Sequence, residues 1–584
     1  MFLPKKSLIL FEYKNYTMST RKLAILIFAL AGAILTSSCV SNNCTDCGID
    51  GKADKIVTGN IITMDSHKMH AEAMTIKNGK VQYVGTKEIA EALCDENTLR
   101  EDYGEASVYP GFIDVHVHPQ MAGQRKMESI NLVGIKTVDG YLEKIAEFVK
   151  AHPEKKTYKG AGWSPRDREM LAKDLDKICA DKPIVLNSID GHSYWLNSKA
   201  LEAFGFTREV AEEDGEAMVH VDAEGNPSGV VVEEAERLAQ HSNADINEEK
   251  EVLLLWQDFA FSLGLTTVGD AGFSSPVDLD AYSQLEKEGK LKLLTYCSYY
   301  EPIPGQSVDE KLTNAINARE KYNGDFFKVS GIKMFVDGVV EGHTAWMIDD
   351  YCDQPGYTGV KKLDDHDYLV KLVSGANTNG LYVHLHTIGD GAVKFAVDAI
   401  EEAQKQTGIY NARNCMAHLQ ILRSEDIKRI ADNNIVAIVA PLWTPYDNSV
   451  SPLETIYIGN ERCENAYPIK SFLDYGGVIA FHSDYPVSSA VSIPGSISTA
   501  VQRCNPGFEA RHPEKEGISR LQALEAMTTN AAYALGDNTI GSLESGKKAN
   551  YVVFDADFLK DSFDDILASS AVATAVGGEI VYKR

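Results

Sequence analysis

Short apolar runs alternate with longer amphipathic segments through most of this chain. A run rich in Val, Ile and Leu between Gly or Asn residues is typical of a strand buried on both faces, and helices join parallel strands of this kind. The pattern therefore predicts repeated β/α units and an α/β fold class. Eight such units would close into a (β/α)₈ barrel of the TIM type. The expected core strands lie at residues 111–116, 264–269, 292–298, 329–335, 381–386, 414–418, 435–440 and 478–483.

The two ends of the chain have a different pattern. Residues 54–85 contain short β-rich runs around Asn78-Gly79, a dipeptide typical of a tight hairpin turn, and the C-terminal tail repeats this character. The interval between the first two core strands is too long for one crossover connection, which predicts an insertion there. We therefore expect a small β-sandwich domain from residues 54–110 and 541–584, and a barrel over residues 111–540 with an inserted subdomain at about 120–260.

The N-terminus has the pattern of an export signal. Arg21 and Lys22 precede the apolar run 23–35, and small residues then lead to Cys39. This arrangement resembles a bacterial lipoprotein signal, with Met18 as an alternative start. It predicts a signal region over residues 1–38 and a tether over 39–53 that carries a lipid on Cys39. The signal predicts an exported bacterial lipoprotein of the periplasm or cell envelope, anchored to the membrane at Cys39. An uncleaved N-terminal anchor is the alternative, and either case places the body of the protein outside the cytosol.

Composition and charge narrow the range of partners. The 584 residues are 44% hydrophobic and 24% charged, which is ordinary for a globular protein, and the formal net charge is -27. Such an acidic chain lacks the basic patch that neutralises phosphates. We therefore expect no nucleic acid partner, and membrane contact only through the lipid anchor.

Metal-ligand side chains gather at the ends of the expected strands. His116 and His118 end the first strand, and residues two apart in a strand point to the same face, so both imidazoles could bind one ion. Taken alone, the pair is better explained as two histidines of a half-buried strand. Further candidates end the fourth, fifth, sixth and eighth strands. They are Lys333, His384 and His386, His418, and Asp484.

These candidates also have structural explanations when each is taken alone. His418 could be a core histidine, Asp484 a helix N-cap, and Lys333 a surface lysine whose stem lies on the barrel. A lysine within an apolar strand is costly, however, unless it is paired or modified. Catalytic residues of a TIM barrel lie at the C-terminal ends of its strands, so the recurrence of ligand types at these ends favours a metal centre.

Several motifs carry a resemblance to a known family. The chain resembles the amidohydrolase superfamily, and within it the YtcJ-like branch that includes N-substituted formamide deformylases. The resemblance extends from about residue 54 to residue 584. The matching segments are YPGFIDVHVHP, DGHSYWLNSKAL, LGLTTVGDAG, GIKMFVDG, HLHTIGDGA, AHLQ, FHSDYPV and GSLESGKKANYVVFD.

The resemblance implies a role for each candidate ligand. His116 and His118 would bind one divalent ion, expected to be Zn²⁺, and Asp484 would bind the same ion and act as the catalytic general base. A second ion would lie on His386 and His418, and Lys333 would be carboxylated and bridge both ions. If Lys333 is unmodified, a mononuclear site with the same histidines and Asp484 is the alternative. His384, also on the fifth strand, is expected to lie deeper.

The implied activity is hydrolysis of a C–N bond by metal-activated hydroxide, in an amide, N-acyl, N-formyl or cyclic amide substrate. Two alternatives stay open: deamination of an amino-heterocycle on the same fold, and a lipid-anchored binding protein without catalysis. We expect a small-molecule substrate, with His192, Trp163 and Arg462 as candidate contacts. Structural roles are the alternative for these three residues. A homodimer is one expected assembly.

Overall fold

Eight parallel strands form the central sheet, and each coincides with one of the expected core strands. The sheet order runs from β5 through β12 to β18 in sequence order. The last strand then returns beside the first, where the backbone N–H of Asp484 donates to the carbonyl of His116 (3.0 Å). The predicted α/β fold with a TIM-type barrel is therefore confirmed. The strands are β5 (Phe112–Val117), β12 (Leu265–Asp270), β13 (Leu294–Tyr299), β14 (Phe327–Phe335), β15 (Tyr382–Thr387), β16 (Cys415–His418), β17 (Val436–Val439) and β18 (Ile479–Phe481).

This computed structural model describes residues 49–584, except for 127–129, 165–166, 190–192, 216–217, 233–244, 273–275, 302, 304, 447–450, 489 and 505–509. The predicted signal region, Cys39 and His192 therefore lie outside the described residues. Within the described part of the chain, no helix combines the length and apolar character that crossing a membrane requires.

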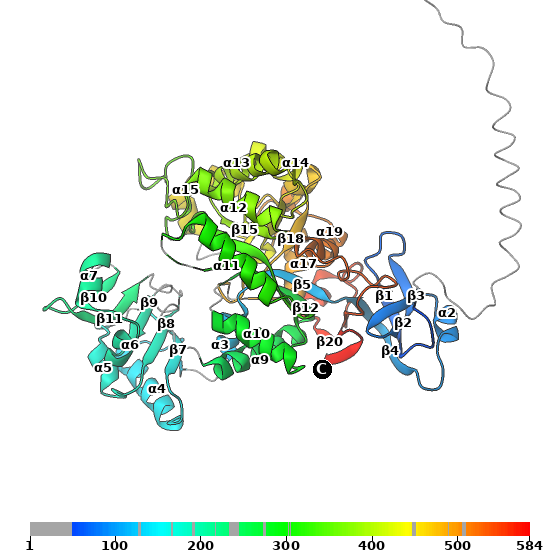
Figure 1. Cartoon of the computed structure of the whole chain (residues 1–584), viewed down its shortest axis with the longest axis horizontal. Coiled ribbons are helices and arrows are strands. Elements are labelled where there is room, and N and C mark those ends of the chain that lie inside the picture. Colours follow the sequence, from blue (N-terminus) through cyan, green and yellow to red (C-terminus); the bar gives the residue numbers. More distant parts are fainter. Residues whose placement is uncertain are drawn as a thin grey trace, which may run out of the picture. The chain divides into compact units, whose positions relative to one another are not determined.

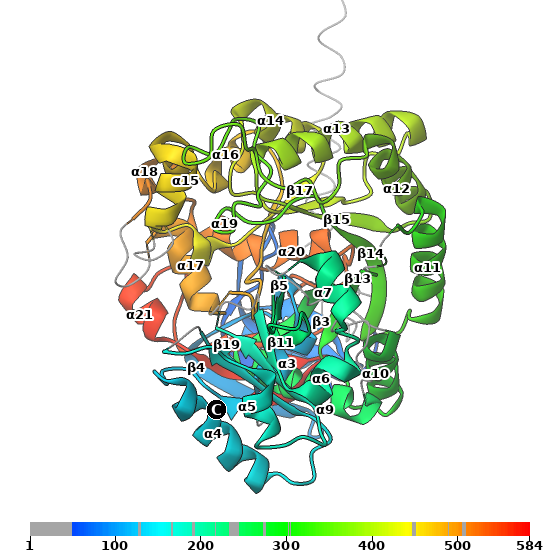
Figure 2. The same ribbon diagram turned by 90° about the vertical axis from the view of Figure 1, so that its left-hand side faces the viewer.

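Helices follow the barrel strands, and Figure 2 shows α11 to α14 outside strands β13 to β15. The apolar faces of strands and helices share one large buried core, as expected for a packed barrel. The helices after β5 and β12 to β18 are α9 (Ile246–Ser262), α10 (Pro276–Lys287), α11 (Val308–Lys321), α12 (His366–Thr378), α13 (Asp390–Thr407), α14 (Ser424–Asp432), η1 (Pro441–Trp443), α15 (Ser451–Glu464), α16 (Ile469–Asp474), α17 (Ile493–Gln502), α18 (Pro513–Glu516), α19 (Arg520–Ala526) and α20 (Thr529–Ala534).

A seven-stranded sheet combines both ends of the described chain, blue and red in Figure 1. Strand β19 pairs with β4, and Asn78-Gly79 forms the expected turn between β2 and β3, both residues having positive φ. The elements are β1 (Lys55–Ile62), β2 (His70–Lys77), β3 (Lys80–Gly85), α2 (Lys87–Ala92), β4 (Leu99–Pro110), β19 (Tyr551–Phe554), α21 (Phe563–Ala568), β20 (Ala571–Val576) and β21 (Glu579–Lys583).

A separate six-stranded sheet lies between β5 and β12 in the sequence and has an apolar core of its own. Strands β6 to β8 are parallel, and β9 to β11 add antiparallel pairs. The elements of this interval are α3 (Pro119–Lys126), β6 (Ile130–Asn131), α4 (Val138–Ala151), β7 (Tyr158–Trp163), α5 (Ala172–Asp176), β8 (Ile184–Ser188), β9 (Ser193–Leu196), α6 (Ser198–Ala203), α7 (Arg208–Asp214), β10 (Val219–Val221) and β11 (Pro227–Val232).

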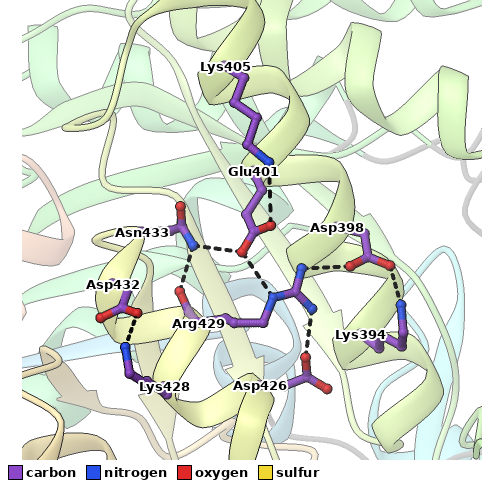
Figure 3. A network of polar contacts seen from close by, with 9 residues as sticks. All are labelled: Lys394, Asp398, Glu401, Lys405, Asp426, Lys428, Arg429, Asp432 and Asn433. Atoms are coloured by element: carbon purple, nitrogen blue, oxygen red, sulfur yellow. Dashed lines mark hydrogen bonds and ion pairs between the residues drawn. The ribbon is translucent and has the colours of Figure 1, made fainter. Parts of the chain in front are cut away.

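A charged network joins helices α13 and α14 on the outside of the barrel (Figure 3). The Arg429 guanidinium of α14 donates to Glu401 (3.0 Å) and Asp398 (2.6 Å) of α13, and to Asp426 (2.8 Å) of its own helix. The hydrogen bond from Arg429 is the largest of the effects that hold the pKa of Glu401 below its ordinary value. One side chain thereby links the packing of two neighbouring β/α units.

We expect Arg429→Gln to lower the free energy of unfolding at pH 7 by about 1–2 kcal/mol. This loss is larger than that of a typical exposed ion pair and smaller than that of a fully buried charge-assisted hydrogen bond. Because the pKa of Glu401 is depressed in the folded state, this contribution is present above its ordinary value of 4.5 and is lost as the pH falls through the lowered value. Urea unfolding at pH 7 and at about pH 3 measures both effects. Lys428→Gln, which removes only a pair with Asp432 on the surface of α14, is the matched control. Equal midpoints for the two variants would contradict the prediction.

Candidate metal centre

The first and last barrel strands bring three ligand-type side chains to one point. His116 lies in β5, His118 follows it, and Asp484 lies just beyond β18. A single Asp484 oxygen, Oδ1, is 3.2 Å from His116 Nε2 and 3.1 Å from His118 Nε2. All three side chains are buried. Asp484 has a φ of 56°, a left-handed conformation that is uncommon for a residue other than glycine.

The fifth and sixth strands add two more imidazoles. One ligand atom each of His116, His418 and Asp484 lie within 4.8 Å of one another, a spacing that suits a shared ion. The His386 ring centroid is 4.5 Å from that of His418. The structure thus places all the predicted histidine ligands, together with Asp484, in one cluster at the C-terminal ends of the strands.

Lys333 lies on β14 within the same barrel interior. It is paired in register with His384 of β15, one strand away, and only 1% of its surface is exposed. Its Nζ has no hydrogen-bond partner among the described residues. Burial lowers the pKa of Lys333 to about 7, so a large share of the amine is neutral near physiological pH.

The charge state of the site suits a divalent cation. Burial lowers the pKa of several imidazoles, to about 4 for His482, so their nitrogens offer lone pairs at neutral pH. Burial opposes ionisation of Asp484, but the hydrogen bond from His118 and the nearby imidazoles hold the pKa of this carboxyl well below its ordinary value. The other histidines whose pKa burial lowers are His116, His384, His386 and His418.

Several buried nitrogens of the same cluster have no hydrogen-bond partner among the described residues. Both ring nitrogens of His482 and Nδ1 of His418 lack hydrogen-bond partners among the described residues, as does Lys333 Nζ. An unpaired buried polar group costs about 1–3 kcal/mol, so a cluster of them is explained by a group that they bind. The donor set of neutral imidazoles and a carboxylate therefore fits a zinc-type ion.

Asp337 is hydrogen-bonded to one imidazole of the cluster and to backbone N–H groups near it. It follows β14, is fully buried, and accepts hydrogen bonds from His386 Nδ1 (3.2 Å) and from the backbone N–H groups of Trp346 (3.0 Å) and Gly389 (2.8 Å). The N–H of Ile388 also donates to it (3.1 Å). A carboxylate on Nδ1 orients the ring and leaves Nε2 to face a ligand.

Sequence reasoning missed several residues of this site. Asp114 accepts from the N–H groups of His116 and Ser483, and burial raises its pKa to about 7. Trp443 is stacked on His418, with ring centroids 5.4 Å apart and planes inclined by 8°. The alternation of Asp114 with His116 and His118 was a usable signal, since all three point to one face. No sequence signal indicates Trp443, because the contact depends on the loop after β17.

Trp163 and Arg462, two of the residues expected to contact substrate, have other partners in the structure. The Trp163 ring is 2% exposed within the core of the inserted sheet, where its Nε1 donates to the carbonyl of Leu186 (2.6 Å). The Arg462 guanidinium donates to the carbonyls of Asp349 (3.1 Å) and Asp350 (2.8 Å). Neither contact involves the histidine cluster. His192 lies outside the described residues.

A TIM-type barrel with imidazole and carboxylate ligands at its C-terminal end defines a class of metal-dependent hydrolases. The chain belongs to the amidohydrolase family, whose family model matches residues 102–582. The family resemblance and the prediction of a metal-dependent hydrolase are thereby confirmed.

Named relatives cover nearly the whole chain. "Putative amidohydrolase YtcJ" of Bacillus subtilis (strain 168) is 26% identical over 90% of this chain and 98% of its own length. The N-substituted formamide deformylase of Arthrobacter pascens is 24% identical over 91% of this chain and 98% of its own. The crystal structure of a metal-dependent hydrolase from Pyrococcus furiosus has a TM-score of 0.72 and 25% identity, covering 87% of this chain and all of the other.

We expect Asp337→Ala to destabilise the protein by about 3 kcal/mol or more, because it leaves two buried backbone N–H groups, of Ile388 and Gly389, and the partly buried one of Trp346 without an acceptor. Loss of the carboxylate that accepts from His386 Nδ1 should also weaken metal binding about 10–100-fold. Urea unfolding of the metal-free protein and titration with Zn²⁺ measure the two effects. Asp353→Ala, which removes a partly exposed partner of His343, is the control and should change neither quantity much. Wild-type stability in Asp337→Ala would refute the support role.

Proposed function

We propose that the protein hydrolyses the C–N bond of a small amide, with N-acyl, N-formyl and cyclic amides as its substrate classes. The observation that carries this proposal is the meeting of His116, His118 and His418 around Asp484 in a buried site. The name of the Arthrobacter pascens relative supports the N-formyl class. A binding protein without catalysis has no need for such a cluster of costly, unpaired polar groups.

The residues of the site suggest how the chemistry is divided. His116, His118 and Asp484 would hold one divalent ion, and His386 and His418 a second. His418 also lies near enough to His116 and Asp484 to share the first ion. Bound ions of this kind lower the pKa of water toward neutrality and polarise a carbonyl group. Asp484 accepts the proton of the attacking water and passes it to the leaving nitrogen, which departs as an amine.

Lys333 would complete a two-ion site as a carbamate. The neutral amine forms an N–C bond with CO₂ and releases one proton, so a buried amine becomes an anionic ligand. The lowered pKa of Lys333, its burial and its unpaired Nζ support this modification. An unmodified lysine would leave the mononuclear alternative.

We further propose that the protein is exported and attached to the membrane by a lipid on Cys39. The support is the pattern of Arg21-Lys22, an apolar run and small residues before the cysteine. Metabolic labelling with a fatty acid of the protein produced in a bacterial host tests it, with Cys39→Ala as the unlabelled control.

The activity itself is tested with a panel of N-formyl amines, N-acyl amines and cyclic amides, on wild type and on Asp484→Asn. We expect wild type to release amine from at least one class, and the variant to lose about 10²–10⁴-fold in kcat while it keeps most of its metal, because the proton acceptor is gone but the histidines remain. Asp353→Asn should behave as wild type. A fully active Asp484→Asn would place the base elsewhere, and ammonia release from amino-heterocycles alone would make the protein a deaminase.

Removal of CO₂ tests the carbamate. Metal-stripped protein that is reloaded with Zn²⁺ in the presence of bicarbonate should bind about two ions per chain, and fewer when bicarbonate is excluded, because the bridging anion cannot form. Metal analysis and hydrolysis rates measure the change. Lys333→Met should be indifferent to bicarbonate. The same indifference in wild type would favour the mononuclear site.

A further inference from the structure

His384 joins the metal centre through a chain of buried hydrogen bonds. Its Nε2 lies 2.9 Å from Nδ1 of His116, and its Nδ1 lies 3.1 Å from Oγ of Ser298. His116 continues the chain, because its Nε2 is 3.2 Å from Oδ1 of Asp484. Each of these four side chains is at most 4% exposed, so water does not compete for the contacts.

Both ring nitrogens of His384 are occupied by these partners, so His384 has no lone pair directed at the ion. Its influence must pass through His116. We infer that His384 is a positioning residue, which sets the tautomer of His116 so that the lone pair of Nε2 faces the metal. This inference rests on the metal centre proposed above, and not on the identity of the substrate.

The other ligand histidines show why His116 needs such a partner. Nδ1 of His118 lies 3.3 Å from the carbonyl oxygen of Gly272, and Nδ1 of His386 lies 3.2 Å from a carboxylate oxygen of Asp337. Both oxygens can only accept, so each of them favours a proton on Nδ1 and a lone pair on Nε2. At His118 the Asp484 carboxylate, 3.1 Å from Nε2, competes for the proton as it does at His116. Nδ1 of His116 faces a nitrogen instead, which can donate or accept. The tautomer of His116 therefore depends on the tautomer of His384.

Ser298 and Tyr382 favour one arrangement of donors and acceptors along this series of hydrogen bonds. Ser298 Oγ donates to the Tyr382 hydroxyl (3.3 Å), which leaves the serine oxygen to accept from Nδ1 of His384. A neutral His384 with its proton on Nδ1 has its lone pair on Nε2. It then accepts from Nδ1 of His116, and Nε2 of His116 is left as a metal ligand.

When no ion is bound, Asp484 favours the opposite position of the proton on His116. Its carboxylate accepts hydrogen bonds and therefore favours a proton on Nε2 of His116, the atom that must be free for the ion. Without an acceptor at Nδ1, the proton would stay on Nε2, and metal binding would require its removal. The acceptor that His384 supplies removes this competition in advance.

Two variants of similar size and polarity separate this role from simple packing. In His384→Gln the side-chain amide lies near the position of Nε2 and can still accept from His116. In His384→Asn the amide lies near the position of Nδ1 and meets Ser298, but does not reach His116. The apparent Zn²⁺ affinity of each metal-free protein is measured by competition with a chromophoric chelator, without substrate, and thermal melting of the metal-free forms compares their folding.

We expect the Gln variant to bind Zn²⁺ within a few-fold of wild type and the Asn variant to bind it about 10–100-fold more weakly, with similar melting temperatures for both metal-free variants. Equal affinities of the two variants, either both unchanged or both weakened, would overturn the inference. Wild-type protein that binds no metal would overturn the metal centre as well. Failure to cleave any amide would overturn only the proposed substrates and leave these affinities unaffected.

Discussion

The seam between the first and last barrel strands is the contact on which the site depends. The backbone N–H of Asp484 donates to the carbonyl of His116, and the N–H of His118 donates to the carbonyl of Tyr485. The buried carboxyl of Asp114 accepts from both sides of this seam. These bonds hold two histidines and an aspartate, more than 360 residues apart in the chain, with their side-chain atoms within hydrogen-bond distance. The cluster cannot form before the barrel closes, so closure and site assembly are one event.

Burial has opposite effects on stability and on function here. It keeps the imidazoles neutral and ready to bind a cation, yet it leaves Lys333, His418 and His482 with unpaired nitrogens in the barrel. Such groups destabilise the metal-free fold. A ligand that binds only the folded protein recovers that free energy, so metal binding and folding stability are coupled at this site.

The partners behind the ligand rings control how those rings are presented. They come from different parts of the barrel: a loop carbonyl at Gly272, a carboxylate at Asp337 after β14, and an imidazole at His384 within β15. Two of these partners can only accept a hydrogen bond, whereas Ser298 determines which nitrogen of His384 accepts. Of the two ions proposed, the one on His116 would therefore depend on a longer hydrogen-bonded chain than the one on His386.

Apolar periodicity alone located all eight barrel strands, and the ligand types at their ends indicated the metal centre, because strand alternation and the C-terminal ends of parallel strands are local and general rules. The Asn78-Gly79 hairpin was readable for the same reason. The sequence did not reveal the roles of Asp337, His384 or Trp443, nor that Trp163 lies in the core of the inserted sheet. Those roles depend on register between strands and on loop paths, which bring together residues that no sequence spacing connects. The chain thus determined by itself which side chains could bind an ion, and only the tertiary structure determined how each of them is oriented.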